Sequence, residues 1–270
     1  MIRPRQNILR VAPQYQPLFR EVGLDAEAVF DHQLIRPWRT LPDRENCTLD
    51  FTDEAGNEHR WHIKRYRAPS FGLRTPADLE VDGYRALHAH DVPTAHLVAW
   101  GQVADRRSFV ISEDLHGYEA ADKLIASSAV GFDRLLKPTA TLAAKLHGAS
   151  LHHRDLYLCH FFAHVPGDDP NETVDLKLID VARVRPLRSP LTRKRWIVKD
   201  LAQFWFSTLE HKSIDDAARN AWLEAYAQQR GGIDIGSLRS AILRKSDWIA
   251  RHDKNLREAQ PNRNISIPTE

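Results

Sequence analysis

The chain has 270 residues, with 38 Lys and Arg against 36 Asp and Glu, and a formal net charge of +2 with histidine neutral. Hydrophobic residues make up 42% and charged residues 27%, which is ordinary globular composition and excludes a largely disordered chain. The near balance of charge gives no sign of a nucleic-acid partner, so we expect none. Two cysteines, Cys47 and Cys159, are too few for a disulfide framework or a cysteine-based zinc site and favour a reducing compartment.

No stretch reaches the roughly 18 uncharged apolar residues that a membrane-spanning helix needs. The first 20 residues contain early arginines but no continuous apolar segment typical of a secretion signal. We therefore expect no transmembrane segment, and a protein that is soluble or peripheral.

The first half of the chain has the pattern of strands and one helix. Residues 47–51 and 60–66 predict a hairpin, because the turn-forming residues 52–57 separate them. Thr75 and Pro76 predict a helix start, since a hydroxyl caps the helix and proline suits its first position; this helix should end near His90. The apolar run 108–112 predicts a buried strand.

Beyond Gly117 the sequence predicts a mainly helical region. We expect a helix that ends near residue 149, short strands at 160–164 and 174–181 around the turn at 166–170, helices at 197–208, 218–229 and 235–252, and a polar, frayed C-terminal tail. Four tryptophans fall on apolar helical stripes and are expected in the core: Trp196, Trp205, Trp222 and Trp248.

Three polar positions suggest phosphoryl transfer. His153-Arg154-Asp155 follows a predicted helix, His160 comes five residues after the aspartate, and Asp180 follows Leu178-Ile179 at a strand end. In kinases, such an aspartate accepts the proton of the acceptor hydroxyl, the residue five positions later helps to hold metal, and the strand-end aspartate binds magnesium. The structural alternatives are a loop aspartate that caps a turn, for Asp155, and a salt bridge to a nearby arginine, for Asp180.

The residues around this motif resemble the lipopolysaccharide core kinases of the WaaP and Kdo-kinase type. The matching pattern is His153-Arg-Asp-Leu-Tyr-Leu-Cys-His-Phe161, Leu178-Ile-Asp180, a basic stretch, and Lys199-Asp-Leu201. Upstream, Lys64 matches the strand lysine of the family, Glu80 the glutamate of the following helix, and residues 109–115 its hinge strand. The resemblance covers about residues 35–210.

The resemblance implies an α+β, two-lobed protein-kinase-like fold, with a small N-terminal antiparallel sheet carrying one helix and a larger, mainly helical C-terminal lobe. The implied divisions are an N-terminal extension at 1–34, the small lobe at 35–115, the large lobe at 116–258 and a tail at 259–270. ATP would bind between the lobes with Mg²⁺.

The resemblance also implies a role for each site residue. It implies that Asp155 is the catalytic residue and that Asp200 is a structural support of the catalytic loop. It implies that the nucleotide is contacted by Lys64, Glu80, Glu113 and Leu115, and that the metal ion is bound by Asp180 and His160. The acceptor would be contacted by Arg183, Arg185 and Arg188.

Two features depart from ordinary protein kinases. His160 stands where they have asparagine, and imidazole is a poor magnesium ligand, so His160 could instead hold a phosphate oxygen or position Asp155. No Gly-x-Gly occurs between Trp38 and Cys47, so any cradle for the phosphates must come from a turn without glycine, with help from Arg39 or Arg44.

Seven basic residues and no acidic one lie between Arg183 and Lys199. This charge suits an acceptor that carries carboxylates or phosphates, and it would also attract an anionic membrane surface. A solvated basic loop is the structural alternative. Only 20 positions separate Asp180 from Asp200, which leaves little room to dock a peptide and favours a sugar acceptor.

We therefore expect an ATP-dependent kinase that phosphorylates a heptose or Kdo hydroxyl of the lipopolysaccharide inner core, in the cytoplasm or peripherally on the inner face of the cytoplasmic membrane. The sugar is inherited from the resemblance. The alternatives are a protein kinase and a pseudokinase that only binds a partner. A zinc hydrolase is disfavoured, because His147, His152 and His153 do not follow the His-Glu-x-x-His spacing.

Overall fold

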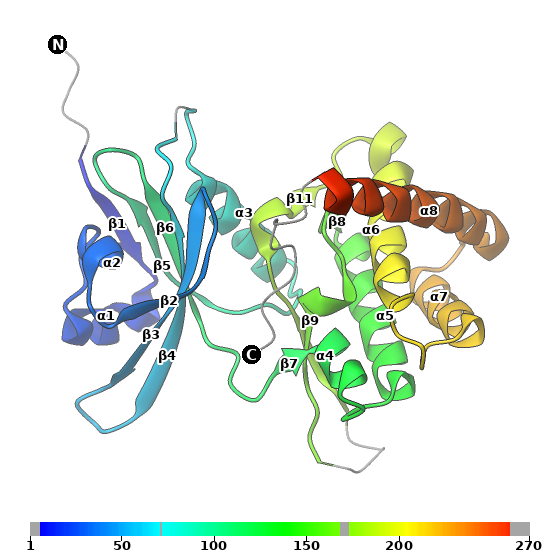
Figure 1. The fold of residues 1–270 in the computed structure, drawn as a ribbon, viewed down its shortest axis with the longest axis horizontal. Coiled ribbons are helices and arrows are strands. Elements are labelled where there is room, and N and C mark those ends of the chain that lie inside the picture. The colour runs from blue at the N-terminus through cyan, green and yellow to red at the C-terminus, as the bar shows by residue number, and fades with distance from the viewer. Residues whose placement is uncertain (1–5, 71, 168–172, 260–270) are drawn as a thin grey trace. The chain divides into compact units, whose positions relative to one another are not determined.

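The computed structural model describes residues 6–70, 72–167 and 173–259 (Figure 1). Within these ranges the chain divides into two compact units. The sheet unit comprises Met1–Arg85 and Ala95–His116, and the helical unit comprises Ala86–Thr94 and Gly117–Glu270. The predicted fold class, an antiparallel sheet with a helix followed by a mainly helical part, is confirmed.

The sheet unit is built on six strands in the spatial order β1-β5-β6-β4-β3-β2 within its described part. Every pairing in this sheet is antiparallel. The strands are β1 (Ile8–Val11), β2 (Ile35–Thr40), β3 (Arg44–Thr52), β4 (Glu58–Tyr66), β5 (Leu97–Gln102) and β6 (Ser108–Glu113), and the helices are α1 (Gln16–Val22), α2 (Ala28–Asp31) and the greater part of α3 (Pro76–His88).

The hairpin predicted at 47–66 is confirmed as β3 and β4. The turn between them is fixed by Asp53, whose backbone N–H donates to the carbonyl of Asn57 at 2.9 Å and whose carboxylate accepts from the Asn57 amide. The helix predicted at Thr75 is also confirmed. Thr75 Oγ1 accepts from the backbone N–H of Asp78 at 3.2 Å, and the Asp78 carboxylate accepts from the Thr75 N–H at 2.8 Å, so each residue satisfies a free donor of the helix start.

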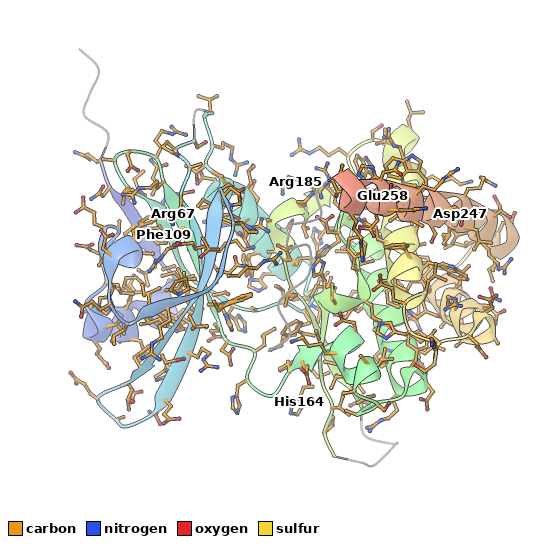
Figure 2. The ribbon with its side chains drawn as sticks, in the orientation of Figure 1. Arg67, Phe109, His164, Arg185, Asp247 and Glu258 are labelled. Carbon is orange, nitrogen blue, oxygen red and sulfur yellow. The ribbon has the colours of Figure 1, made fainter. Side chains whose placement is uncertain are left out.

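The segment set apart as an extension, residues 1–34, contributes directly to the sheet unit. Strand β1 pairs with β5 from Ile8 to Val11, and Phe19 of α1 stacks on Trp61 of β4 with ring centroids 5.7 Å apart. Phe109 of β6, labelled in Figure 2, is fully buried and meets the ring of Phe30 edge-on at 6.1 Å. These contacts place α1 and α2 over one face of the sheet.

The helical unit surrounds one long buried helix, α5 (Phe132–Gly148), which packs against α7. Its other helices are α4 (Ala121–Ala126), α6 (Pro190–Thr208), α7 (Asp216–Arg230) and α8 (Ile235–Ala259), and its short strands are β7 (Glu119–Ala120), β8 (Leu151–His152), β9 (Phe161–His164), β10 (Asp175–Leu178) and β11 (Arg185–Pro186). None of the helices in the described ranges is both long and apolar enough to cross a membrane.

Two predictions for this unit need correction. Helix α6 begins at Pro190 and not near Ile197, because proline occupies its first turn and polar residues follow on an exposed face. Trp248 was expected in the core but is 50% exposed on α8, whereas Trp222 is fully buried and stacks on Phe204 at 4.0 Å. Part of the predicted turn, residues 168–170, and the tail from residue 260 lie outside the described ranges.

Candidate active site

The sheet unit holds a lysine–glutamate pair. Lys64 Nζ lies 2.7 Å from Glu80 Oε1, and the exposed fractions of the two side chains are 18% and 3%. Lys64 comes from β4 and Glu80 from α3, so the pair joins the sheet to its helix. Such a pair, with the lysine partly open to solvent, can present an ammonium group to phosphate oxygens.

Tyr66 completes this pair and was missed by the sequence analysis. It lies two residues after Lys64 on β4, and strand periodicity puts both side chains on one face. The Tyr66 hydroxyl donates to Glu80 Oε2, while Lys64 Nζ donates to Glu80 Oε1. Burial and the neighbouring Glu80 carboxylate raise the pKa of Tyr66, so it stays a donor at neutral pH. The only indication of this contact in the sequence was the alternation of side chains along β4, which puts Tyr66 and Lys64 on the same face of the strand.

The predicted hinge residues lie at the end of β6. Glu113 closes the strand opposite Trp61, and its carboxylate accepts a hydrogen bond from the Tyr15 hydroxyl. Its backbone N–H donates to the carbonyl of His96 at 3.0 Å. Leu115 follows in the segment that leaves the strand and is partly buried. The carboxylate of Glu113 thus binds the N-terminal segment, and its backbone N–H binds His96.

The turn between β2 and β3 stands where a glycine-rich loop would be. Its tip is Pro42-Asp43, and the backbone N–H of Leu41 donates to the carbonyl of Arg44 at 2.8 Å. A proline at the tip removes one backbone donor from this turn. The turn therefore offers fewer amides for phosphate than a glycine loop of the same length.

In the helical unit, Asp200 fastens the loop that carries the His-Arg-Asp motif. Its buried carboxylate accepts from the backbone N–H groups of His153 at 2.6 Å and Arg154 at 2.9 Å, and it lies 3.4 Å from His147 Nε2. Arg154 has a φ of 74°, a left-handed conformation that is costly for a residue with a side chain. The two bonds from Asp200 hold the loop in that conformation.

Asp155 projects from this loop with 17% of its side chain exposed. Its Oδ1 atom lies 2.8 Å from Arg183 Nη1 and 3.5 Å from Gln203 Nε2. Its backbone carbonyl accepts from His160 Nδ1 at 2.6 Å. The carboxylate is thus partly open to solvent and held in place by its neighbours, as a group that must reach a hydroxyl of a substrate needs to be.

Asp180 follows β10 in a left-handed conformation, with φ at 53° and its side chain 36% exposed. Strand β10 is held in place from both sides. Leu178 donates its N–H to the Pro93 carbonyl at 2.9 Å, and its own carbonyl accepts from Thr94 Oγ1 at 2.7 Å. The turn after the strand presents the Asp180 carboxylate at the edge of the catalytic loop, where His160 Nε2 lies 3.9 Å from Asp180 Oδ2.

His160 lies between the two aspartates. Burial would lower its pKa, but a hydrogen bond with Cys159 and the charge of Asp180 outweigh burial and raise the pKa to about 9. Its Nδ1 atom donates to the Asp155 carbonyl, so Nε2 is the ring atom that faces Asp180. Within the described residues, no group of three or more metal-ligating side chains converges.

The predicted acceptor arginines differ in what they contact. Arg183 pairs with Asp155, and Arg185 Nη1 donates to the carbonyls of Ala182 at 3.1 Å and Val184 at 2.6 Å. Arg188 is exposed. The guanidinium of Arg185, which is labelled in Figure 2, thus stabilises its own loop, whereas Arg183 and Arg188 are exposed.

A second cationic group, which the sequence analysis missed, surrounds Trp196 on α6. The charged groups of Arg154, Arg195 and Lys199 lie 4.9, 5.5 and 5.9 Å from its ring centroid. Lys199 also donates to the Arg154 carbonyl, and burial lowers its pKa. Trp196 was expected in the core, but it is only partly buried and serves as a platform for cations beside the catalytic loop.

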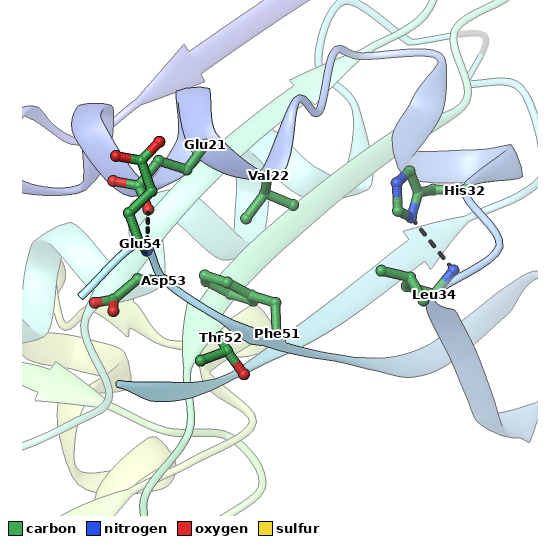
Figure 3. Close-up of a pocket in the computed structure, with 8 residues that line it drawn as sticks. All are labelled: Glu21, Val22, His32, Leu34, Phe51, Thr52, Asp53 and Glu54. Carbon is green, nitrogen blue, oxygen red and sulfur yellow. Dashed lines mark hydrogen bonds between the residues drawn. The ribbon is translucent and has the colours of Figure 1, made fainter. Parts of the chain in front are cut away.

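The cavity shown in Figure 3 does not coincide with these residues. It has a volume of about 330 Å³ and is lined by α1, the loop after α2 and the β3–β4 turn, including Phe51 and Glu54. A second hollow of about 500 Å³ is lined by β1 and α1. Neither is lined by any of the predicted site residues.

Acid should destabilise the helical unit through His152. Burial lowers the pKa of this side chain to about 4, against an ordinary value near 6.5. Between these two values the unfolded chain binds a proton that the folded chain does not, so the free energy of unfolding should fall by up to about 3 kcal/mol as the pH drops through that window. Urea denaturation at successive pH values measures this loss.

The control for this prediction is His152→Gln, which removes the titrating group beside Trp196, where the two rings lie 4.8 Å apart. The variant should show a smaller loss of stability across the same window. An unchanged slope in the variant would assign the acid sensitivity to other groups.

Comparison with known proteins agrees with this arrangement. A sequence profile described as the Lipopolysaccharide kinase (Kdo/WaaP) family matches residues 56–226. Lipopolysaccharide core heptose(I) kinase WaaP from Escherichia coli is 32% identical over 194 residues, which cover 65% of this chain and 71% of that protein. The protein of the same name from strain K12 is 29% identical over 180 residues, which cover 60% of this chain and 66% of the relative.

A solved structure described as WaaP in complex with acyl carrier protein is also similar. It is 25% identical, with a TM-score of 0.67, and the match covers 89% of this chain and 98% of that chain. Lys64, Asp155 and Asp180 all lie within residues 56–226, which the family profile matches. The chain adopts a protein-kinase-like fold and belongs to the lipopolysaccharide kinase (Kdo/WaaP) family.

Proposed function

We propose that this kinase transfers the γ-phosphate of ATP to a hydroxyl of a heptose or Kdo in the lipopolysaccharide inner core. Membership of the family supports a kinase that uses ATP and acts on this class of sugar. The names of the relatives, core heptose(I) kinases, favour heptose. We further propose that the protein acts in the cytoplasm, peripherally on the inner face of the cytoplasmic membrane.

The observation that carries the proposal is the arrangement of Asp155, His160 and Asp180 around one loop. Asp155 accepts the proton of the attacking hydroxyl and orients the oxygen for in-line displacement. His160 donates its Nδ1–H to the Asp155 carbonyl, and its Nε2 lies 3.9 Å from Asp180 Oδ2, so we assign it a role in positioning Asp155 or in binding a phosphate oxygen.

Asp180 fits a magnesium site. Magnesium prefers hard oxygen ligands and is commonly held by one or two carboxylates together with substrate phosphates, so a single exposed carboxylate at a strand end matches its needs. When bound, the ion would neutralise charge that develops on the phosphates. Asp180 would hold it, and phosphate oxygens and water would complete its ligands.

Lys64, in the sheet unit, would bind the nucleotide. Its ammonium group binds phosphate oxygens of the nucleotide, and Glu80 fixes its position. Tyr66 holds Glu80 in turn, so Glu80 and Tyr66 together hold the Lys64 ammonium group, which donates to the phosphates, in one position. Glu113 and Leu115 would contact the base through their backbone.

The acceptor is proposed to carry negative charge. Arg183, Arg188 and the cations around Trp196 supply positive charge on both sides of Asp155. The Arg183–Asp155 pair would separate when the acceptor binds, because the same guanidinium can bind a carboxylate or phosphate of the sugar in a forked geometry. Asp155 would then be free to accept the hydroxyl proton.

The proposal is tested by incubating the protein with ATP labelled at the γ-phosphate, Mg²⁺, and separated glycolipid, free core-sugar and protein acceptors. Label should appear in the lipid and sugar fractions. Label confined to polypeptide would favour the protein kinase alternative instead. Nucleotide binding without turnover toward any acceptor would favour the pseudokinase alternative.

A further inference from the structure

We propose that the N-terminal half of α6 and the adjoining part of α8 form a docking surface for an anionic lipid bilayer. The α6–α8 surface, as we name it, consists of Leu191, Lys194, Arg195, Lys245 and Trp248. The proposal deepens the proposed function, since a lipid-linked sugar acceptor lies at a membrane.

Two large apolar side chains of this surface face solvent. Leu191, in the first turn of α6, is 94% exposed, and Trp248 on α8 is 50% exposed. A soluble helix normally turns such residues inward, as α8 does with Ile242 and Ile249. Leucine and tryptophan are among the side chains that insert into the interface of a bilayer. Leucine reaches the acyl chains, and tryptophan lies at the level of the headgroups.

Basic side chains surround the apolar ones. Lys194 and Arg195 follow Leu191, and the described residues contain no carboxylate paired with either of them. On α8, Arg244 and Arg251 are exposed on either side of Trp248, and Asp247 is the acidic neighbour of this tryptophan. The surface keeps a clear excess of positive charge, which an anionic headgroup layer complements.

Packing of α6 against α8 joins the exposed residues of the two helices into one surface. They pack against each other and cross in Figure 1. Lys245 Nζ lies 3.5 Å from the centroid of the Trp248 ring, and burial together with the nearby charge of Arg195 lowers the pKa of Lys245. Arg195 lies four residues after Leu191 on α6, so the two side chains share one face of that helix.

Docking through this surface would bring the catalytic loop close to the membrane. From Leu191 to Asp200 is nine residues of continuous helix, or about 14 Å. Asp200 holds the loop that carries Asp155. A bilayer at the start of α6 would therefore place the headgroup region within one sugar-chain length of the catalytic loop.

A membrane fits these features better than an acidic protein or a nucleic acid. A protein partner would need an apolar groove of its own that matches Leu191 and acidic groups that match the surrounding cations, whereas on the proposed function a lipid-linked acceptor brings a bilayer with it. A nucleic acid would be bound through phosphate contacts, which give the exposed leucine no role. A bilayer receives an isolated apolar side chain flanked by cations without any groove.

The test is co-sedimentation of the full chain with vesicles of phosphatidylglycerol mixed with phosphatidylcholine, and with vesicles of phosphatidylcholine alone. The protein should bind the anionic vesicles and not the neutral ones. Leu191→Ser should weaken binding about tenfold, by removing buried apolar surface. Lys194→Gln should weaken it about fivefold, and Trp248→Ser should weaken it also.

Matched controls are Leu73→Ser, a fully exposed leucine of the sheet unit, and Lys212→Gln, an exposed lysine after the C-terminal end of α6. Both should bind as the unmodified protein does. Equal binding to neutral vesicles, full binding by Leu191→Ser, or equal weakening by the controls would overturn the proposal. Leu191→Ser decides the question if Trp248→Ser fails to fold.

Transfer assays separate this proposal from the proposed function. The surface variants should phosphorylate a delipidated core sugar normally and lose activity only toward acceptor embedded in vesicles. If the unmodified protein phosphorylates no sugar at all, the proposed function is wrong, and the vesicle result still decides the docking surface. Equal activity of Leu191→Ser on both acceptor forms would contradict the docking role.

Discussion

Asp180→Asn and Asp155→Asn should each reduce phosphate transfer to the sugar acceptor by about a thousandfold while the protein remains folded. Asp180→Asn removes the charged oxygen proposed to hold Mg²⁺, and Asp155→Asn removes the group proposed to accept the hydroxyl proton; each loss is of this order in enzymes. Steady-state transfer rates measure the effect. Near-normal turnover in either variant would rule out the mechanism.

A matched control lies on β10, the strand that precedes the metal-binding candidate Asp180. Asp175, at the start of β10, is exposed and accepts a hydrogen bond from the Tyr118 hydroxyl. Asp175→Asn should keep transfer within about twofold of normal, since a surface contact of this kind contributes little. A loss in Asp175→Asn as large as in Asp180→Asn would show that disturbance of β10, and not loss of a ligand, explains both.

Asp200→Ala should lower the free energy of unfolding by about 3–5 kcal/mol and abolish transfer. The substitution leaves the backbone N–H groups of His153 and Arg154 without their acceptor in a buried place, and each such donor costs about 1–3 kcal/mol. It also removes the bonds that hold Arg154 in its left-handed conformation. Urea denaturation measures the loss.

Asp216→Ala is the control for this variant. Asp216 lies in the first turn of α7, is 78% exposed, and pairs with Arg219 at 2.9 Å. Its removal should cost less than about 1 kcal/mol, as for other exposed ion pairs. Should Asp200→Ala be no less stable than Asp216→Ala, the assignment of Asp200 as the support of the catalytic loop would be wrong.

The sequence was informative where local chemistry determines structure. The turn at Asp53 and the cap at Thr75 each depend on residues within four positions, so their patterns predicted β3, β4 and α3 correctly. The resemblance also supplied roles for motif positions that are far apart in the chain, and these roles stay predictions.

Long-range contacts could not be predicted in the same way. Nothing in residues 1–34 indicates that Ile8 pairs with Gln102, since strand pairing over such a separation depends on the whole sheet. The same holds for the salt bridge of Arg183 to Asp155 and for the Tyr66–Glu80 hydrogen bond. Trp248 was misplaced because helical periodicity gives the apolar face of α8 but not the residues at its border.

The most direct test of the account is tandem mass spectrometry of the core oligosaccharide after incubation with the protein, ATP and Mg²⁺. The account predicts one new phosphate ester on a heptose or Kdo for each ADP released, and none when Asp155→Asn replaces the unmodified protein. ADP released without any sugar phosphate, or phosphate found only on polypeptide, would contradict it.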